Sequence, residues 1–219
     1  MSNCIRTPLL SILHRVKRIH DGVAVDELER VLNEFANETR TVTKANKTVV
    51  TDLRSSIDIL AISSIILSER EEGVTSKERE DVFSATNSIM DINTKDAWKE
   101  FHEQTGENNA ATILSIVSNI SELVLQTLPP NDSVYYVRDN LALQIQRTNI
   151  EQITYPDSNM PNFGSHAILP KATILNSFNV SQTVDYTAAY FRTISKFLHS
   201  NSDRLVKNVG SDVISFSLN

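Results

Sequence analysis

The apolar residues of this chain change their spacing near Pro129-Pro130, and this change limits the fold more than any other feature of the sequence. Before the two prolines, apolar residues recur every three or four positions, which is the period of amphipathic helices. After them, apolar and polar residues alternate, which is the period of half-buried strands. Helices first and strands second predict an α+β protein or two abutting subdomains, with the change of pattern at the two prolines.

The helical half contains recognisable start and stop signals. Gly22 follows the first apolar stripe and suits the end of a helix. Thr75 and Glu78 have the spacing of a capping box, in which each side chain accepts a hydrogen bond from a free backbone N–H near the helix start. The segment 49–65 carries apolar residues on more than one face, so we expect it to be the central helix of the bundle. The last long helix is expected at about residues 108–128.

The second half contains four segments with strand character. Apolar residues alternate with polar ones in residues 141–146 and again in residues 213–218. Residues 186–197 are rich in aromatic and β-favouring side chains. Residues 167–174 are also β-rich but are interrupted by Pro170, which predicts an edge strand or a kink.

Composition and motif searches exclude several kinds of chemistry. A net charge of −6, without a basic run, argues against a nucleic-acid partner, and only five glycines leave no glycine-rich phosphate loop. One cysteine, Cys4, allows neither an internal disulfide framework nor a cysteine-rich zinc site. No HExxH or GxSxG motif is present. We therefore predict no catalytic residue, no cofactor and no metal site, and no segment is apolar over the ~20 residues that a membrane span needs.

Trp98 is the only tryptophan, and its sequence context allows two interpretations. An exposed Trp98 would be an anchor for a protein partner. Its spacing from Ala97 and Phe101 favours a place in the helical core instead.

The sequence also contains Asn-X-Ser/Thr acceptors for N-linked glycans. Each would carry a glycan if the chain enters the secretory pathway. The five acceptors are Asn37, Asn46, Asn119, Asn131 and Asn179.

Several stretches, in the same order along nearly the whole chain, resemble one known family. They are SNC at residue 2, VFSATNSIMD to DAWKEF from residue 82, AATILSIVSNISELVL from residue 110, NLALQIQ from residue 140, YFRTISKFL from residue 190 and VISFSLN from residue 213. Together they resemble the GAIN domain of adhesion G-protein-coupled receptors, closest to the latrophilin branch.

The resemblance implies a domain plan. Residues 1–6 would be the remnant of an upstream hormone-receptor-like domain, with Cys4 pairing with a cysteine before Met1. Residues 7–130 would be a helical bundle, subdomain A, and residues 131–219 would be an incomplete antiparallel β-sandwich, subdomain B. In the family this sandwich continues into a proteolysis motif with paired cysteines and a His-Leu-Ser/Thr triplet, which lies outside this sequence. The chain itself is therefore expected not to be an enzyme, whereas its parent protein would be self-cleaving if the triplet follows.

These expectations lead to one preferred function and one alternative. The chain would be an extracellular scaffold segment that supports the proteolysis motif and links adhesion modules to the transmembrane signalling domain. Its partners would be the C-terminal proteolysis-motif strand and the transmembrane domain of the same receptor. Cell-surface adhesion ligands would bind through the upstream domains. The alternative is an intracellular helical protein-interaction module, which the acidic charge and the single cysteine also fit.

Overall fold

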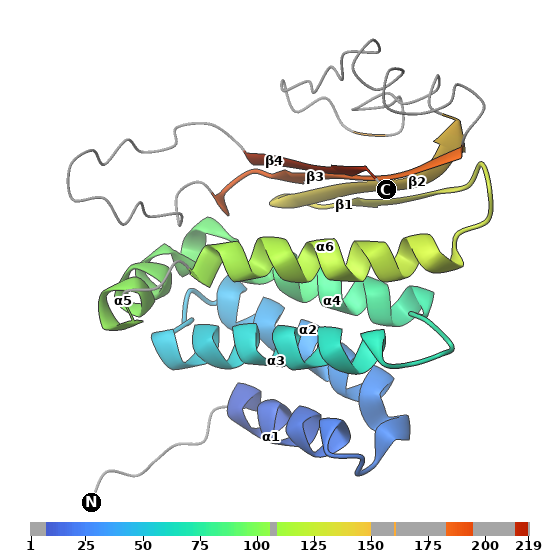
Figure 1. Ribbon diagram of the computed structural model, residues 1–219. Coiled ribbons are helices and arrows are strands. Elements are labelled where there is room, and N and C mark those ends of the chain that lie inside the picture. Colours follow the sequence, from blue (N-terminus) through green and yellow to red (C-terminus); the bar gives the residue numbers. More distant parts are fainter. Residues whose placement is uncertain (1–7, 106–108, 150–159, 161–182, 195–212, 219) are drawn as a thin grey trace, which may run out of the picture.

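The computed structural model describes residues 8–105, 109–149, 160, 183–194 and 213–218. Six α-helices precede four strands in these residues, so the predicted α+β order is confirmed (Figure 1). The helices are α1 (Pro8–His20), α2 (Leu28–Lys44), α3 (Val50–Ser68), α4 (Ser76–Ile89), α5 (Lys95–Thr105) and α6 (Asn109–Thr127), with short 3-10 helices η1 (Val25–Glu27) and η2 (Ile92–Thr94). The strands are β1 (Ser133–Val137), β2 (Leu141–Asn149), β3 (Thr183–Phe191) and β4 (Val213–Leu218).

The predicted helix signals act as expected. Gly22 adopts a φ of +82° after α1, and the next residue donates its N–H to the carbonyl of Arg18 at 2.8 Å, which closes the last turn. At the start of α4, Thr75 Oγ1 accepts the N–H of Glu78 at 3.1 Å, and Glu78 Oε2 accepts the N–H of Thr75 at 3.0 Å. This reciprocal pair is the predicted capping box.

Helix α3 is central, as its apolar residues on several faces predict. It contacts α1, α4, α5 and α6, and Leu53, Ile59 and Leu60 are fully buried. Four serines of α3 are also buried. They are Ser55, Ser56, Ser63 and Ser64.

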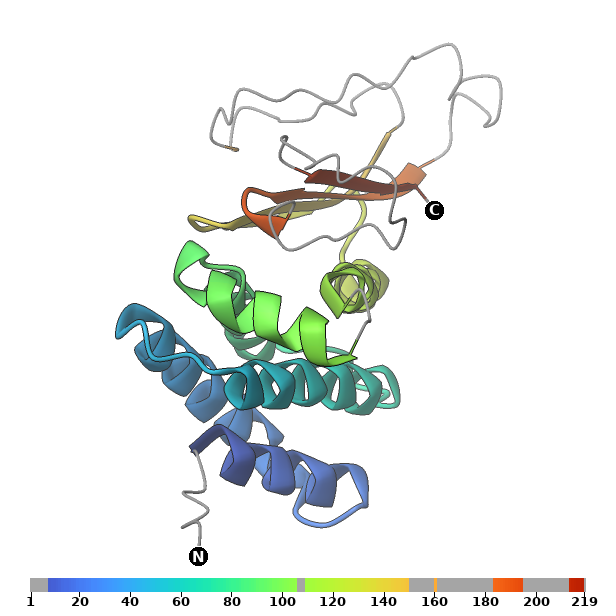
Figure 2. The ribbon, with the colours of Figure 1, turned by 90° about the vertical axis from the view of Figure 1, so that its left-hand side faces the viewer.

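The strands form one antiparallel sheet in the order β1-β2-β3-β4. Leu143 of β2 lies opposite Tyr136 of β1 on one side and Ala189 of β3 on the other, and Ala188 of β3 lies opposite Phe216 of β4. The sheet covers the helices as a separate layer, with α6 and α4 directly beneath it and α1 at the far end of the molecule (Figures 1 and 2).

The antiparallel β-sandwich that the resemblance implies is wrong for the described residues, which contain a single sheet. One face of this sheet packs against helices rather than against a second sheet (Figure 2). Leu141, Leu143 and Ile145 belong to the same core as the apolar residues of α4 and α6. Alternation along a strand shows only that one face is buried, and it does not show whether a helix or a sheet covers that face.

The strand boundaries differ in part from those that the sequence predicts. Strand β1 was not predicted, although its sequence Ser-Val-Tyr-Tyr-Val is rich in β-favouring residues. Strand β3 ends at Phe191, well before residue 197. Strand β4 has the bounds of the predicted 213–218 segment. The predicted strand at 167–174 lies outside the described residues.

Candidate functional site

The described residues offer little for acid–base or metal chemistry. No three of their His, Cys, Asp and Glu side chains gather closely enough to hold a metal ion. His14 and His20 are exposed on α1, while His166 and His199 lie outside the described residues. In the same part of the chain, no helix has the length and apolar character needed to cross a bilayer. The remaining candidates are a surface groove and the contact between the helices and the sheet.

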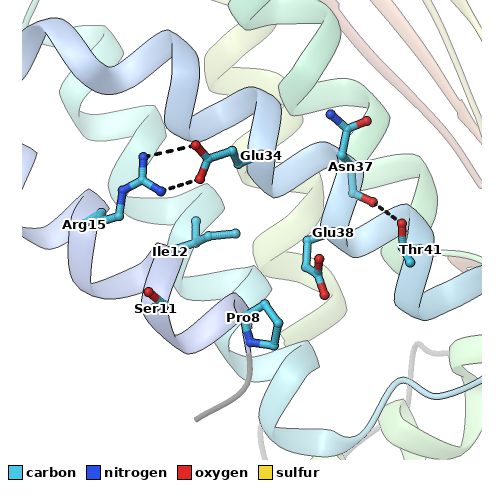
Figure 3. Close-up of a pocket in the computed structure, with 8 residues that line it drawn as sticks. All are labelled: Pro8, Ser11, Ile12, Arg15, Glu34, Asn37, Glu38 and Thr41. Carbon is cyan, nitrogen blue, oxygen red and sulfur yellow. Dashed lines mark hydrogen bonds and ion pairs between the residues drawn. The ribbon is translucent and has the colours of Figure 1, made fainter.

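The groove lies between α1 and α2 and has a volume of about 430 Å³ (Figure 3). Arg15 crosses it and donates two hydrogen bonds to the carboxylate of Glu34, so these two charges neutralise each other. Glu38 turns its carboxylate toward Pro8. The lining residues are Pro8, Ser11, Ile12, Arg15, Glu34, Asn37, Glu38 and Thr41. With its one cation already paired and its walls open, the groove has no arrangement typical of catalysis.

The contact between the helices and the sheet is built around an apolar seam. Phe83 of α4 and Tyr136 of β1 meet with their ring centroids 5.4 Å apart and the rings tilted by 54°. Leu143 and Phe191 are fully buried in the same core. Burial of these large side chains links the two layers, because separating them would expose apolar surface on both.

The carboxyl end of α4 forms a polar clamp beside this seam. The last carbonyls of a helix have no partner within the helix, so they need donors from elsewhere. Asn140, in the β1–β2 turn, donates its side-chain amide to the carbonyl of Asn87 at 3.3 Å, and its backbone N–H to the Asn87 side chain at 2.9 Å. Thr193, just after β3, donates its hydroxyl to the carbonyl of Met90. The sheet thus supplies donors for the end of a bundle helix.

Other helices supply donors to the carbonyls between these two. Trp98 of α5 donates its indole N–H to the carbonyl of Ile89 at 2.8 Å, and Thr94 donates its hydroxyl to the same oxygen at 2.8 Å. Thr43 of α2 donates to the carbonyl of Ser88 at 3.4 Å. We call residues 87–90 and these donors the α4 clamp. Elements α2, α4, η2, α5 and the sheet all meet there.

A second clamp holds the other end of the seam. Arg147 of β2 forms two hydrogen bonds with Asp185 of β3, at 2.6 and 2.8 Å, and donates a third to the carbonyl of Leu128 at 2.7 Å. The hydrogen bonds that Arg147 donates to Asp185 raise the pKa of Arg147, so the guanidinium remains charged. Leu128 directly follows α6, so one side chain connects two strands to the end of a helix. A guanidinium that donates two hydrogen bonds to one carboxylate also fixes the relative orientation of the two side chains.

An exposed ion pair lies at the edge of the seam. Arg138 pairs with Glu80 of α4, and its guanidinium carbon lies 4.9 Å from the ring centroid of Tyr136. Arg138 and Glu80 are each about half exposed, so this pair contributes little stability. Burial raises the pKa of Tyr136 well above its ordinary value, so its hydroxyl stays protonated.

The structure resolves the two interpretations of Trp98. Its side chain is only 4% exposed and belongs to the main core, so the core interpretation is confirmed. Its indole N–H is used in the α4 clamp. As it stands, Trp98 presents no surface to a partner.

Four of the predicted glycan acceptors lie at the surface. Asn37 on α2, Asn46 after α2, Asn119 on α6 and Asn131 before β1 are all exposed. The fifth, Asn179, lies outside the described residues, as does Cys4. Exposure leaves room for a bulky glycan at each of the four described acceptors.

Apart from Trp98, the clamp residues were missed by sequence reasoning, although the pattern around Arg147 contained a signal. Arg147 continues the phase of Leu141, Leu143 and Ile145 and so falls on the buried face of β2. A charge in an apolar phase requires a partner, which predicts a buried ion pair or a hydrogen-bonded end of a helix. No comparable signal marks Thr193, because its partner lies 103 positions away in the sequence.

Comparison with known proteins finds no protein-family model that matches this chain and no curated protein with significant similarity to it.

Proposed function

We propose that this chain is an extracellular scaffold segment of an adhesion G-protein-coupled receptor of the GAIN type. The observation that carries the proposal is the joining of a six-helix region to an antiparallel sheet through one shared core and two polar clamps. A scaffold that transmits force between adhesion modules and a membrane domain needs its two layers to be linked firmly. The apolar seam and the clamps supply such a link without any catalytic group.

Two further features support the proposal. The order of helices before strands agrees with the plan that the resemblance implies, although the described residues hold one sheet where the family has a sandwich. The exposed positions of Asn37, Asn46, Asn119 and Asn131 fit a chain that passes through the secretory pathway. The proposed partners are the proteolysis-motif strand and the transmembrane domain of the same receptor, and adhesion ligands bound through other domains.

The transcript that encodes the chain provides the first test. The reading frame after Asn219 should encode paired cysteines, a His-Leu-Ser/Thr triplet and then seven apolar spans. A triplet in which another residue replaces the Ser/Thr would leave the scaffold role and remove self-cleavage. A stop codon directly after Asn219 in every transcript would contradict the receptor proposal.

The native protein provides the second test. In intact source cells, a membrane-impermeant biotin reagent should label it, and an N-glycosidase should reduce its mass. Asn→Gln variants at four positions, expressed from the full reading frame, should each lower the mass of the protein by one glycan. The positions are Asn37, Asn46, Asn119 and Asn131. A native protein that is neither labelled nor sensitive to the glycosidase would favour the intracellular interaction module.

A further inference from the structure

Helix α1 presents one face to solvent at the end of the molecule farthest from the sheet (Figures 1 and 2). Its other face packs against α2 and α3. The buried residues of that face recur at helical spacing, and they are Leu9, Ile12, Leu13, Val16 and Ile19. The packing fixes which side chains of α1 point outward.

The outward face of α1 is basic, although the whole chain carries a net charge of −6. Helix α1 contains no Asp or Glu, and the exposed side chains of His14, Lys17 and Arg18 lie at positions i, i+3 and i+4, which share one side of a helix. We call these three residues the α1 basic face. Neither the net charge nor the search for a basic run revealed this face, because its three side chains are interrupted along the chain by Val16 and most acidic residues lie on other elements.

One exposed carboxylate follows the α1 basic face in the chain, that of Asp21, and its Oδ1 lies 3.9 Å from Nδ1 of His20. Arg15, beside this face, is held by Glu34 and lies 3.9 Å from Glu27. No ion pair involves Lys17 or Arg18 among the described residues. Their position in the last turn of α1 is favourable with respect to the helix dipole, but this leaves both charges facing solvent.

We infer that the α1 basic face binds a sulfated glycosaminoglycan at the cell surface. Closely spaced Arg, Lys and His on a helix are typical of patches that bind heparin-like polyanions. The inference rests on the proposed extracellular location, where sulfated glycans are the abundant linear polyanions. None of the five glycan acceptors lies in α1, so the chain's own N-glycans are attached elsewhere.

Heparin-affinity chromatography of the folded chain tests the inference. The wild-type protein should be retained at about 0.15 M salt, where exposed charges farther apart than ~8 Å are largely screened. The double variant K17A/R18A should bind heparin about 5- to 10-fold more weakly, since two exposed charge contacts are lost. The matched control K95A/K99A removes the same charge from exposed positions on α5 and should bind like the wild type. Equal thermal melting of the three proteins shows that folding is unaffected.

Several outcomes would overturn the inference. Wild-type protein that flows through the heparin column at this salt concentration contradicts it, and so does a control variant that loses as much affinity as K17A/R18A. Equal binding to chemically desulfated heparin would show that sulfate is not recognised. Equal affinity for double-stranded DNA or for phosphatidylserine vesicles would assign the face to another polyanion. These measurements use purified protein, so they can fail while the transcript test of the proposed function succeeds, and the reverse.

Discussion

At the scale of single residues, two equally buried threonines distinguish the contribution of a hydrogen bond to stability from that of burial. Thr193 and Thr187 are both 7% exposed, but only Thr193 donates its hydroxyl, to the carbonyl of Met90. The hydroxyl of Thr187 is buried without a partner. A buried hydroxyl without a partner destabilises the folded state, so its removal should not lower stability. Removing the donor of a buried carbonyl does lower stability, because the carbonyl is then left unpaired.

The two Thr→Val substitutions should therefore have different effects. T193V should lower the free energy of unfolding by about 1–2 kcal/mol, because it removes a donor from the α4 clamp. T187V should leave stability unchanged or raise it by up to about 1 kcal/mol, because valine keeps the shape and favours strands. Urea denaturation followed by far-UV circular dichroism measures both. Equal losses would show that the clamp hydrogen bond adds nothing beyond packing.

Asp81 predicts a pH dependence of stability. It lies on α4, and burial raises its pKa above the ordinary 3.8, while a hydrogen bond from Asn33 and the charge of Lys77 oppose this shift. The carboxylates of Glu29 and Glu80 raise it further. The folded state therefore binds the proton more tightly than the unfolded state, so stability falls as pH rises from 3.8 to the raised pKa.

Two variants test this sign. D81N cannot ionise, so its free energy of unfolding should not show this fall and should exceed that of the wild type at neutral pH. N33A removes a hydrogen bond that lowers the pKa of Asp81, so the fall should extend to higher pH. Urea denaturation across this pH range gives the curves. A D81N curve parallel to that of the wild type would exclude Asp81 as the source.

At the scale of elements, two glycines at helix ends differ in what surrounds them. Gly22 and Gly73 both have positive φ, at +82° and +72°. A Cβ at Gly22 would meet nothing within 4 Å, whereas one at Gly73 would lie 2.7 Å from Cγ2 of Thr127, at the end of α6. Gly73 thus lets the α3–α4 loop approach α6.

Alanine substitutions should separate backbone strain from this close approach. G22A should cost about 1–2 kcal/mol, the strain of a left-handed backbone. G73A should cost about 1–3 kcal/mol more, because of the clash. T127S removes the clashing methyl group and keeps the hydroxyl that bonds to Val124, so G73A/T127S should fall back toward the G22A value. Thermal and urea denaturation measure all four variants. A double variant as unstable as G73A would exclude Thr127 as the cause.

The elements also show how far sequence reasoning reaches in this chain. Local signals such as Gly22 and the Thr75–Glu78 capping box located helix ends correctly, because the groups involved lie within a few residues of each other. The β-sandwich implied by the resemblance was wrong for the described residues, and the alternation of Leu141 and Leu143 could not correct it, because a strand pattern does not show what covers the buried face. The α4 clamp joins residues that are far apart in the sequence, such as Asn87 and Asn140, so no local sequence pattern predicts it.

At the scale of the whole molecule, the shared core predicts that helices and sheet unfold together. Leu143 lies in the sheet and is fully buried against the helices, whereas Trp98 lies in α5 and is the only tryptophan. Fluorescence of Trp98 therefore reports on the helical layer, while a substitution at Leu143 perturbs the sheet. If the two layers unfold as one unit, a substitution that destabilises the sheet must also lower the unfolding midpoint that Trp98 fluorescence reports.

The L143A variant makes this prediction quantitative. Truncation of a buried leucine should cost about 2–5 kcal/mol, and the midpoint of Trp98 fluorescence in urea should fall by the corresponding amount. L32A, at a fully buried position in α2, is the matched control for a truncation made within the helical layer. Both variants should give one transition, with the same midpoint by fluorescence and by far-UV circular dichroism. If L143A left the Trp98 midpoint unchanged while L32A lowered it, the sheet would unfold separately and could not transmit force to the helices in the proposed scaffold.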